Sequence, residues 1–410
     1  MIAAATGGSA SVARVLIAKG LDVNVMAGSG GTPLMIAARA GAAECVQVLL
    51  EADAKVDTVA APSAEFVAEV TALRAQPDET LSEAELDSKR QRLDAYYEAG
   101  STALMHAASM GHHECVALLV AAGADARLKD SDRQSALVHA ASSGSTRSVS
   151  ILLEAANADP NDTIGEGAGT PLLVRMMAAG SETIAEQLLV AGAAVNAAVD
   201  GISPLLLAAQ AGSMRLLTLL VRSGANLNVA SDSGVSPLMV LAAAGHARGV
   251  KLLIDGAKAL SVPPDLLVRV VDATTENGTT ALHMAAKQAH VKVVAELLNA
   301  SASPRLSDLG GQTALGATYD GLQAVAKYVD EALADYSASG DKKLADEMLA
   351  RAAGPHIEVM ELLLAHGAEP SLIDKEGNTV DAAAIVQTYR SLAKGAESAR
   401  EPRGSTKDEL

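Results

Sequence analysis

Apolar and small residues recur along this chain in a pattern that repeats about every 33 residues. Each repeat begins with Thr or Ser, then Pro or Ala, then Leu, as at Thr32-Pro33-Leu34 and Ser203-Pro204-Leu205. A pair of small residues follows, then a Gly step, then a second apolar segment with paired leucines such as Leu49-Leu50, and finally Gly-Ala. A fixed period of this size indicates one supersecondary unit stacked many times.

The residue types within each repeat predict its local structure. Thr and Ser hydroxyls cap helix N-termini, and Pro suits the first helical position. Small residues let neighbouring helices approach closely, and a Gly after the leucines fits a left-handed helix C-cap. Each repeat is therefore predicted to be a short helix, a tight turn, a second helix and a polar, hairpin-like tip. The opening phrase starts at Thr32, Thr102, Ser135, Thr170, Ser203, Ser236, Thr280 and Thr313.

The phrases Thr-Pro-Leu-x-x-Ala-Ala and Leu-Leu-x-x-Gly-Ala resemble those of the ankyrin repeat family over nearly the whole chain. The resemblance implies an all-α fold, an ankyrin-type solenoid of stacked helix-turn-helix units with short hairpin-like tips and helical insertions. Extending the 33-residue frame places a further repeat at Asp346, which lacks the phrase, and half a repeat at Thr379. With half a repeat before Thr32, we expect nine full repeats and a half repeat at each end.

The period breaks in three places, and these breaks define the predicted segments. We assign residues 1–57 to a truncated first repeat and the first full repeat, 58–98 to a helical insertion, 99–319 to a repeat array with a short insertion near 258–275, 320–349 to a degenerate repeat region, 350–390 to the last repeat and C-terminal cap, and 391–410 to a disordered tail.

The 58–98 insertion has a helical pattern of its own. Phe66, Val70 and Leu73 are at helical spacing, and Ser82-Glu83-Ala84-Glu85 fits a capping box before a second, charged helix. This pattern predicts a helical hairpin that protrudes from the array. A badly degraded repeat is the alternative.

Composition and charge exclude several kinds of partner. The chain is 49% hydrophobic but only 2% aromatic, and its net charge is −17. This charge opposes DNA, RNA and anionic membranes, and the lack of aromatic residues argues against base stacking. No apolar stretch is long enough to span a membrane. We expect a monomer that binds no nucleic acid and does not insert into a membrane.

Candidate catalytic and metal-binding residues are few. Cys45 and Cys115 occupy equivalent positions of two repeats, so their separation of about one helix-packing distance exceeds disulfide reach. We interpret them as small buried residues. The histidines at repeat turns, and His106 and His139 one period apart, are interpreted as structural. No nucleophile–base set is recognisable, so the sequence predicts no enzyme, metal or cofactor.

The tips are the expected binding surface. Stacked repeats form an extended concave surface from first helices and tips, and the tips have no packing role. A scaffold or adaptor that binds partner proteins there is the leading hypothesis; a weak calcium buffer, or an enzyme that uses an insertion, is the alternative. The candidate partner-binding residues are Arg127, Lys129, Asp130, Asp132, Arg133, Asp200, Asp232, Asp308 and Lys375.

The last four residues, Lys407, Asp408, Glu409 and Leu410, match an endoplasmic reticulum retention signal read by a retrieval receptor. They predict residence in the lumen, with the cytoplasm as the alternative. No signal peptide is visible, so we expect that upstream residues are missing from this sequence. Three acceptor triplets for N-glycosylation begin at Asn161, Asn277 and Asn299 and fit a lumenal setting.

Overall fold

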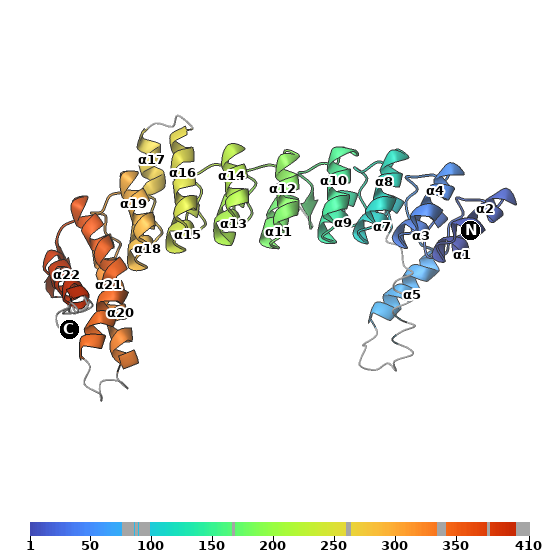
Figure 1. The fold of residues 1–410 in the computed structure, drawn as a ribbon. Coiled ribbons are helices and arrows are strands. Elements are labelled where there is room, and N and C mark those ends of the chain that lie inside the picture. Colours follow the sequence, from blue (N-terminus) through green and yellow to red (C-terminus); the bar gives the residue numbers. More distant parts are fainter. Residues whose placement is uncertain are drawn as a thin grey trace, which may run out of the picture. The chain divides into compact units, whose positions relative to one another are not determined.

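The computed structural model describes residues 1–75, 86, 89, 99–165, 169–259, 264–333, 342–374 and 378–398. The chain forms two compact blocks, which we call the N-terminal block (residues 1–197) and the C-terminal block (residues 198–410). Within each block, antiparallel helix pairs follow one another as in a stack (Figure 1). The predicted solenoid of helix pairs is confirmed.

The N-terminal block contains two rows of helices. Through the first four repeats of the block, first helices pack closely against first helices, and in all of its repeats second helices pack against second helices of the neighbouring repeats. The first helices are α1 (Ile2–Thr6), α3 (Pro33–Arg39), α7 (Ala103–Ser109), α9 (Ala136–Ser142) and α11 (Leu172–Ala178). The second helices are α2 (Ala10–Ala18), α4 (Ala43–Glu51), α8 (His113–Ala121), α10 (Thr146–Glu154) and α12 (Glu182–Val190). The block also contains α5 (Ala64–Ala75), β1 (Thr163–Ile164) and β2 (Thr170–Pro171).

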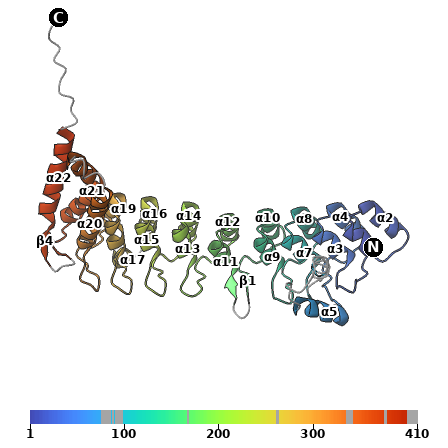
Figure 2. The same ribbon diagram turned by 90° about the horizontal axis from the view of Figure 1, so that it is seen from below.

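The C-terminal block repeats this arrangement with longer helices toward its end (Figure 2). Its first helices are α13 (Pro204–Ala211), α15 (Pro237–Ala243), α18 (Ala281–Lys287) and α20 (Ala314–Leu333). Its second helices are α14 (Met214–Arg222), α16 (Ala247–Ala259), α19 (Val291–Asn299) and α21 (Lys342–Ala365). The other elements are α17 (Pro264–Val271), β3 (Ser371–Ile373), β4 (Thr379–Asp381) and α22 (Ala382–Ser398).

Helix starts follow the predicted capping chemistry. In most repeats the Thr or Ser hydroxyl accepts the backbone N–H three residues later, at 3.2 to 3.4 Å, as in Thr32, Thr102, Ser135, Ser203, Ser236 and Thr280. The anchor at Thr170 is wrong by one residue, because Thr170 lies in β2 and α11 begins after Pro171 without a side-chain cap. In this tip β1 pairs antiparallel with β2, with Thr163 opposite Pro171 and Ile164 opposite Thr170.

Small residues set the spacing of the first helices. Ala37, Ala38, Ala107 and Ala108 are all 0% exposed. At the next turn, His112 Nε2 lies 3.1 Å from the carbonyl oxygen of Arg39 in the preceding repeat, where it donates. Gly41 has φ 70°, and a Cβ there would come within 2.7 Å of the His112 ring. The turn histidine is therefore structural, as predicted.

The 58–98 insertion leaves the stack through a tip. Ala60 N–H donates to Ser101 O at 2.8 Å, and Gly100 N–H donates back to Ala60 O at 3.0 Å. These two bonds close the tip beneath the insertion, so the neighbouring helices α4 and α8 still pack on one another. Helix α5 forms the first part of the insertion, and most of the predicted second helix lies outside the described residues.

The insertion near 258–275 follows a second helix. It lengthens α16 to Ala259 and adds α17 before the next tip. A Cβ at Gly256, within the lengthened part of α16, would lie 2.7 Å from a methyl carbon of Val221 in α14. This glycine lets the longer helix remain close to its neighbour.

The repeats expected at Thr313 and Asp346 are one repeat, so our count of nine full repeats is wrong. Helix α20 packs on α18, and α21 packs on α19, which makes α20 and α21 a single pair with extended ends. The sequence separation between the cap Thr102 and the turn residue His112 is 10 residues. The separation between the equivalent residues Thr313 and His356 is 43 residues. The insertion therefore has the length of one repeat. Counting periods along the sequence cannot distinguish one repeat with this insertion from two successive repeats.

His356 shows that this repeat follows directly on α18 and α19. Its imidazole hydrogen-bonds to the carbonyl of Lys287, the counterpart of the His112 bond to Arg39. Unlike His112, His356 lies inside a helix rather than at a turn, since α21 runs through it and through Pro355. The region 320–349 thus belongs to the extended helices, apart from residues 334–341, which lie outside the described residues.

Two glycines of this repeat provide a test of its packing. A Cβ at Gly321 would overlap the carbonyl oxygen of Lys287 and lie 2.7 Å from His356 Nε2, whereas a Cβ at Gly354 would meet nothing within 4 Å. We expect Gly321→Ala to lower the free energy of unfolding by about 1–3 kcal/mol through overpacking. Gly354→Ala should raise it by about 0.5–1 kcal/mol, because Ala favours the helix. Urea unfolding of both variants measures this, and equal effects would contradict the assigned pairing of α20 with α18.

Candidate interaction surface

Most first helices expose two positions that repeat packing leaves open, although the fourth-position residues Ile36 of α3 and Ala317 of α20 are buried. In α7 the residues around them are buried, while His106 and Ser109 are only partly buried. These are the fourth and seventh residues after the N-cap, and residues three apart lie on the same helix face. We call the two series formed by these positions the open rows.

In the N-terminal block the open rows carry basic and imidazole groups. The fourth positions are Ile36, His106, His139 and Arg175, and the seventh positions are Arg39, Ser109, Ser142 and Ala178, with α11 counted from Pro171. None of the first helices of this block contains Asp or Glu. The second helices instead carry Glu44, Glu51, Glu114, Glu154, Glu182 and Glu186. The acidic side chains are thus confined to the second helices, which also carry Arg14 and Arg147.

The two histidines are held by their own tips. The Nε2 atom of His106 lies 2.9 Å from Ser101 Oγ, and that of His139 lies 2.7 Å from Asp130 Oδ2. Burial lowers the pKa of His106 to about 3, with further contributions from the nearby charges of Arg39 and His139. His106 is therefore a neutral hydrogen-bonding group at neutral pH.

Asp130, one of the predicted partner-binding residues, organises its tip from within. It is 6% exposed. Its Oδ1 accepts the backbone N–H groups of Asp132 and Gln134 at 3.0 and 2.9 Å, while its Oδ2 meets His139. All of its strong contacts are internal, so it positions the tip and leaves partner contact to its neighbours.

Lys129 connects two consecutive tips. Its Nζ lies 2.9 Å from Asp162 Oδ1, and Asp162 is 7% exposed. The Ser135 hydroxyl donates to the other oxygen of the same carboxylate. This pairing satisfies the buried charge of Asp162, while the side chain of Lys129 remains 44% exposed.

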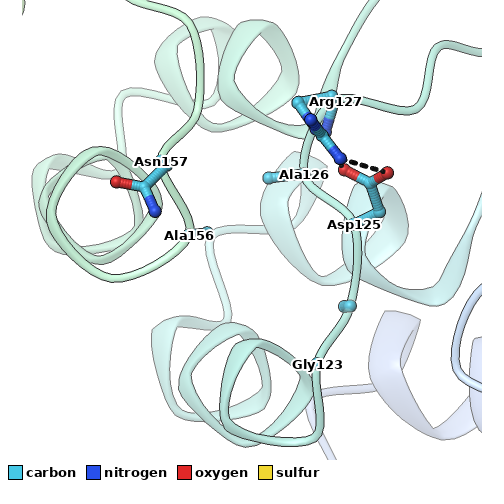
Figure 3. Close-up of a pocket in the computed structure, with 7 residues that line it drawn as sticks. Gly123, Asp125, Ala126, Arg127, Ala156 and Asn157 are labelled. Carbon is cyan, nitrogen blue, oxygen red and sulfur yellow. Dashed lines mark hydrogen bonds and ion pairs between the residues drawn. The ribbon is translucent and has the colours of Figure 1, made fainter.

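Arg127 faces a different part of the surface. Its guanidinium donates to Asp125 through Nε at 3.0 Å and through a terminal nitrogen at 3.3 Å. This hydrogen bonding lowers the pKa of Asp125. Arg127 lines an open hollow of about 540 Å³ between the loops that follow α8 and α10, and Asn157 lies on the opposite side (Figure 3). It does not join the open rows of the first helices.

The remaining predicted tip residues divide by exposure. Asp132, Arg133, Asp200 and Asp232 are exposed, and Arg133 and Asp200 adopt positive φ values of 61° and 49°. Asp308 behaves like Asp130, since its Oδ1 accepts the N–H groups of Gly310 and Gln312, both at 2.9 Å. Lys375 and the four retention residues lie outside the described residues.

In the C-terminal block the fourth positions are apolar. They are Leu207, Val240, Met284 and Ala317, and the first three are partly exposed. Helices α13 and α15 contain no charged residue, and α18 contributes Lys287 at its seventh position. The same structural position is therefore apolar throughout the C-terminal block, whereas in the N-terminal block it is polar in α7, α9 and α11.

Sequence reasoning from the tips alone missed these rows. The signal was available, because the residue four after each cap varies while the residues on both sides of it are small or apolar, except for His283 in α18. Recognising it requires knowing which helix face the stack buries, and the phrase Thr-Pro-Leu-x-x-Ala-Ala does not state this.

The described residues show few features of other site types. No group of three or more His, Cys, Asp or Glu side chains among them could hold a metal ion. Cys45 and Cys115 are free and buried, as predicted, and burial raises the pKa of both thiols, for Cys115 to about 11. Within the same part of the chain, no helix combines the length and apolar character needed to cross a membrane.

Comparison with family models agrees with this architecture. The family model described as ankyrin repeats (3 copies) matches residues 1–60, 78–164 and 173–262, more than half of the chain, and the model of the single ankyrin repeat matches residues 277–309. The crystal structure of the human ASB11 ankyrin repeat domain is similar to this chain, with 26% sequence identity and a TM-score of 0.39. That match covers 52% of this chain and 89% of the other.

The buried imidazole of His106 predicts a pH-dependent stability. Its pKa is about 3 in the folded chain but near 6.5 when unfolded, so the unfolded state takes up the proton first as the pH falls. Between pH 7 and 5 this should remove about 1–2 kcal/mol from the free energy of unfolding. His106→Gln should flatten that part of the profile, as measured by urea unfolding at several pH values. His113→Gln, at an exposed position, is the control, and an unchanged profile for His106→Gln would refute the assignment.

Proposed function

Because this chain belongs to the ankyrin repeat family, we propose that it is a non-enzymatic scaffold that binds partner proteins through its open rows and exposed tip residues. Ankyrin repeats are interaction modules, and stacked repeats offer long continuous surfaces. The observation that carries this proposal is the pair of open positions on most first helices. Their side chains range from Arg and His to Leu and Met, while most of the packed residues around them are small or apolar.

The tips provide further residues for partner contact beside the open rows. Asp130 and Asp308 hold the backbone of their tips, so exposed neighbours such as Asp132 and Arg133 have defined positions. A binding loop that is already ordered loses less conformational entropy on association. We assign a positioning role to Asp130 and Asp308. Partner contact is assigned to the exposed residues Asp132, Arg133, Asp200 and Asp232.

The apolar row of the C-terminal block is a second contact region. Leu207, Val240 and Met284 are partly exposed on the neighbouring first helices α13, α15 and α18. These three helices carry few charged residues. Exposed apolar groups that lie together mark interaction surfaces. Burying apolar surface of such side chains against a partner favours association.

Capture of partners tests this region directly. We expect the double variant Leu207→Asp and Met284→Asp to lose about tenfold in partner recovery, because two charges would replace apolar contacts. Proximity labelling in cells, with the C-terminus left free, measures recovery. Val268→Asp is the matched control, since Val268 is 45% exposed but lies on α17 outside the row. Equal recovery for the double variant and the wild type, with unchanged thermal stability, would contradict a binding role.

We further propose that the protein resides in the endoplasmic reticulum lumen, with the cytoplasm as the alternative location. The C-terminal Lys407-Asp408-Glu409-Leu410 supports this location, because such an ending is recognised by a retrieval receptor. Asn161, Asn277 and Asn299 of the acceptor triplets are all exposed. Exposure is required for modification of a folded surface, so the structure is compatible with glycans at these positions.

Glycosylation and retention test the location together. We expect the endogenous protein to carry glycans that endoglycosidase H removes, and deletion of residues 407–410 to cause its secretion. Asn277→Gln with Asn299→Gln should abolish most of the mobility shift. An unglycosylated protein in the cytosolic fraction would refute lumenal residence without affecting the scaffold proposal.

A further inference from the structure

An apolar surface extends beyond the fourth positions of the C-terminal block. In the N-terminal block, His106 at a fourth position lies 2.9 Å from Ser101, the residue before the cap, so these two positions are neighbours on the surface. In α13 and α15 of the C-terminal block, the residues before the caps are Ile202 and Val235. We call the five apolar residues at these two positions the apolar strip: Ile202, Leu207, Val235, Val240 and Met284.

The apolar strip crosses three neighbouring helices. Helix α15 packs on both α13 and α18 (Figure 1). Ile202 is 40% exposed, and the other four residues of the strip are partly exposed. Packed helices lie about 8–10 Å apart, so the strip is about 16–20 Å long from α13 to α18. Apolar residues that lie together on a surface mark an interaction site.

The tips beside the apolar strip are acidic. Each of three successive tips carries an exposed acid, and these are Asp200, Asp232 and Glu276. The segments 198–202, 225–235 and 272–279, which form these tips, contain no Lys or Arg that would offset the charge. The strip therefore has a negatively charged edge on the side of the tips.

The three tips lie against one another. A Cβ at Gly201 in the first tip would come within 3.0 Å of the backbone nitrogen of Asp232 in the second. The N–H group of Glu276 in the third tip donates to Ser233 O in the second at 3.3 Å. The acids thus follow one another along a continuous edge.

The opposite edge of the strip carries no acid. Lys287, at the seventh position of α18, is exposed three residues after Met284 and lies on the same helix face. The seventh positions of α13 and α15 are the uncharged Gln210 and Ala243. A matching partner therefore has apolar side chains with cations along one edge only.

An amphipathic helix has this distribution of side chains. It places apolar residues at i, i+3, i+4 and i+7 on one face and can carry a row of cations along one edge of that face. The length of the strip corresponds to about three to four helical turns of about 5.4 Å each. An extended strand turns alternate side chains away from the surface, so it offers no such edge.

We propose that the apolar strip binds an amphipathic helix of a partner protein, with Lys or Arg along the edge of its apolar face that meets Asp200, Asp232 and Glu276. This deepens, and rests on, the proposed scaffold function. A second copy of the chain is a poorer occupant, because two chains that each carry a net charge of −17 repel one another.

A designed peptide tests this chemistry. The probe is a fluorescein-labelled helix of about 18 residues built from Leu, Ala and Lys, with Leu on one face and Lys along one edge of that face. One control has the same composition, but its Leu residues are spread around the helix; the other has Glu in place of Lys. The full chain is produced in bacteria, so that Asn277 in the third tip carries no glycan. Fluorescence anisotropy should show the probe binding at least fivefold more tightly than either control.

Ile202→Asp tests the apolar contact. It should weaken binding of the probe about fivefold through loss of apolar contact, whereas the added negative charge alone would strengthen binding of a basic peptide. Val268→Asp is the matched control, since Val268 is 45% exposed on α17 outside the strip. The control should bind the probe at least as tightly as the wild type.

Glu276→Lys tests the acidic edge. It should weaken binding about fivefold, because it replaces an attraction with a repulsion, and the difference should shrink as salt rises. Asp132→Lys makes the same change of charge on an exposed tip of the N-terminal block and should stay within about twofold of the wild type. Both side chains are exposed, so thermal unfolding should be unchanged and this pair remains decisive if Ile202→Asp lowers stability.

Any of three results would overturn the proposal: equally tight binding of the control with dispersed Leu, equal losses for Glu276→Lys and Asp132→Lys, or self-association in analytical ultracentrifugation that Ile202→Asp abolishes. The last result would assign the strip to a second copy of the chain. Failure of the scaffold function is distinguishable, because the Leu207 and Met284 double variant would then keep its partners in cells. If that variant loses its partners while the probe fails to bind, only the assigned partner chemistry is wrong.

Discussion

Close approach of successive first helices is the constraint on which the rest of this structure depends. In most repeats a buried pair of alanines makes this contact, and in α11 the buried Met176 and Met177 take their place. The same closeness brings turn residues within hydrogen-bonding distance of the preceding repeat. His112 reaches the Arg39 carbonyl at 3.1 Å, and Ser143 Oγ reaches the Ala108 carbonyl at 3.0 Å. Packing and polar contacts therefore enforce the same register.

This constraint explains where the chain accepts insertions. One insertion leaves through a tip that two backbone bonds close at Ala60, one follows the second helix α16, and one lengthens α20 and α21 at their far ends. None of the three separates the helix faces that pack between repeats. Extra residues are tolerated wherever the chain can leave and return without opening these contacts, because loop closure costs little as length grows.

The constraint also divides the polar residues between structure and recognition. Acids placed just inside a tip, such as Asp130 and Asp308, bond to the tip backbone, because a buried carboxylate requires hydrogen-bond partners. Side chains four and seven residues after most caps are left at least partly exposed by both neighbours. They are free to differ, and they do: His106, His139 and Arg175 occupy this face in one block, and Leu207, Val240 and Met284 occupy it in the other.

The sequence by itself determined the repeat, its capping residues, its buried alanines and leucines and its left-handed glycines, because each of these obeys a local rule of backbone geometry or helix periodicity. Only the tertiary structure showed that Thr313 and Asp346 belong to one repeat. An insertion as long as the period leaves all later residues in the 33-residue frame, so counting along the sequence does not reveal it. Only the tertiary structure distinguished Asp130, which is buried, from Arg133, which is exposed three residues later. Burial depends on what the neighbouring repeat covers, and no rule confined to one repeat contains that information.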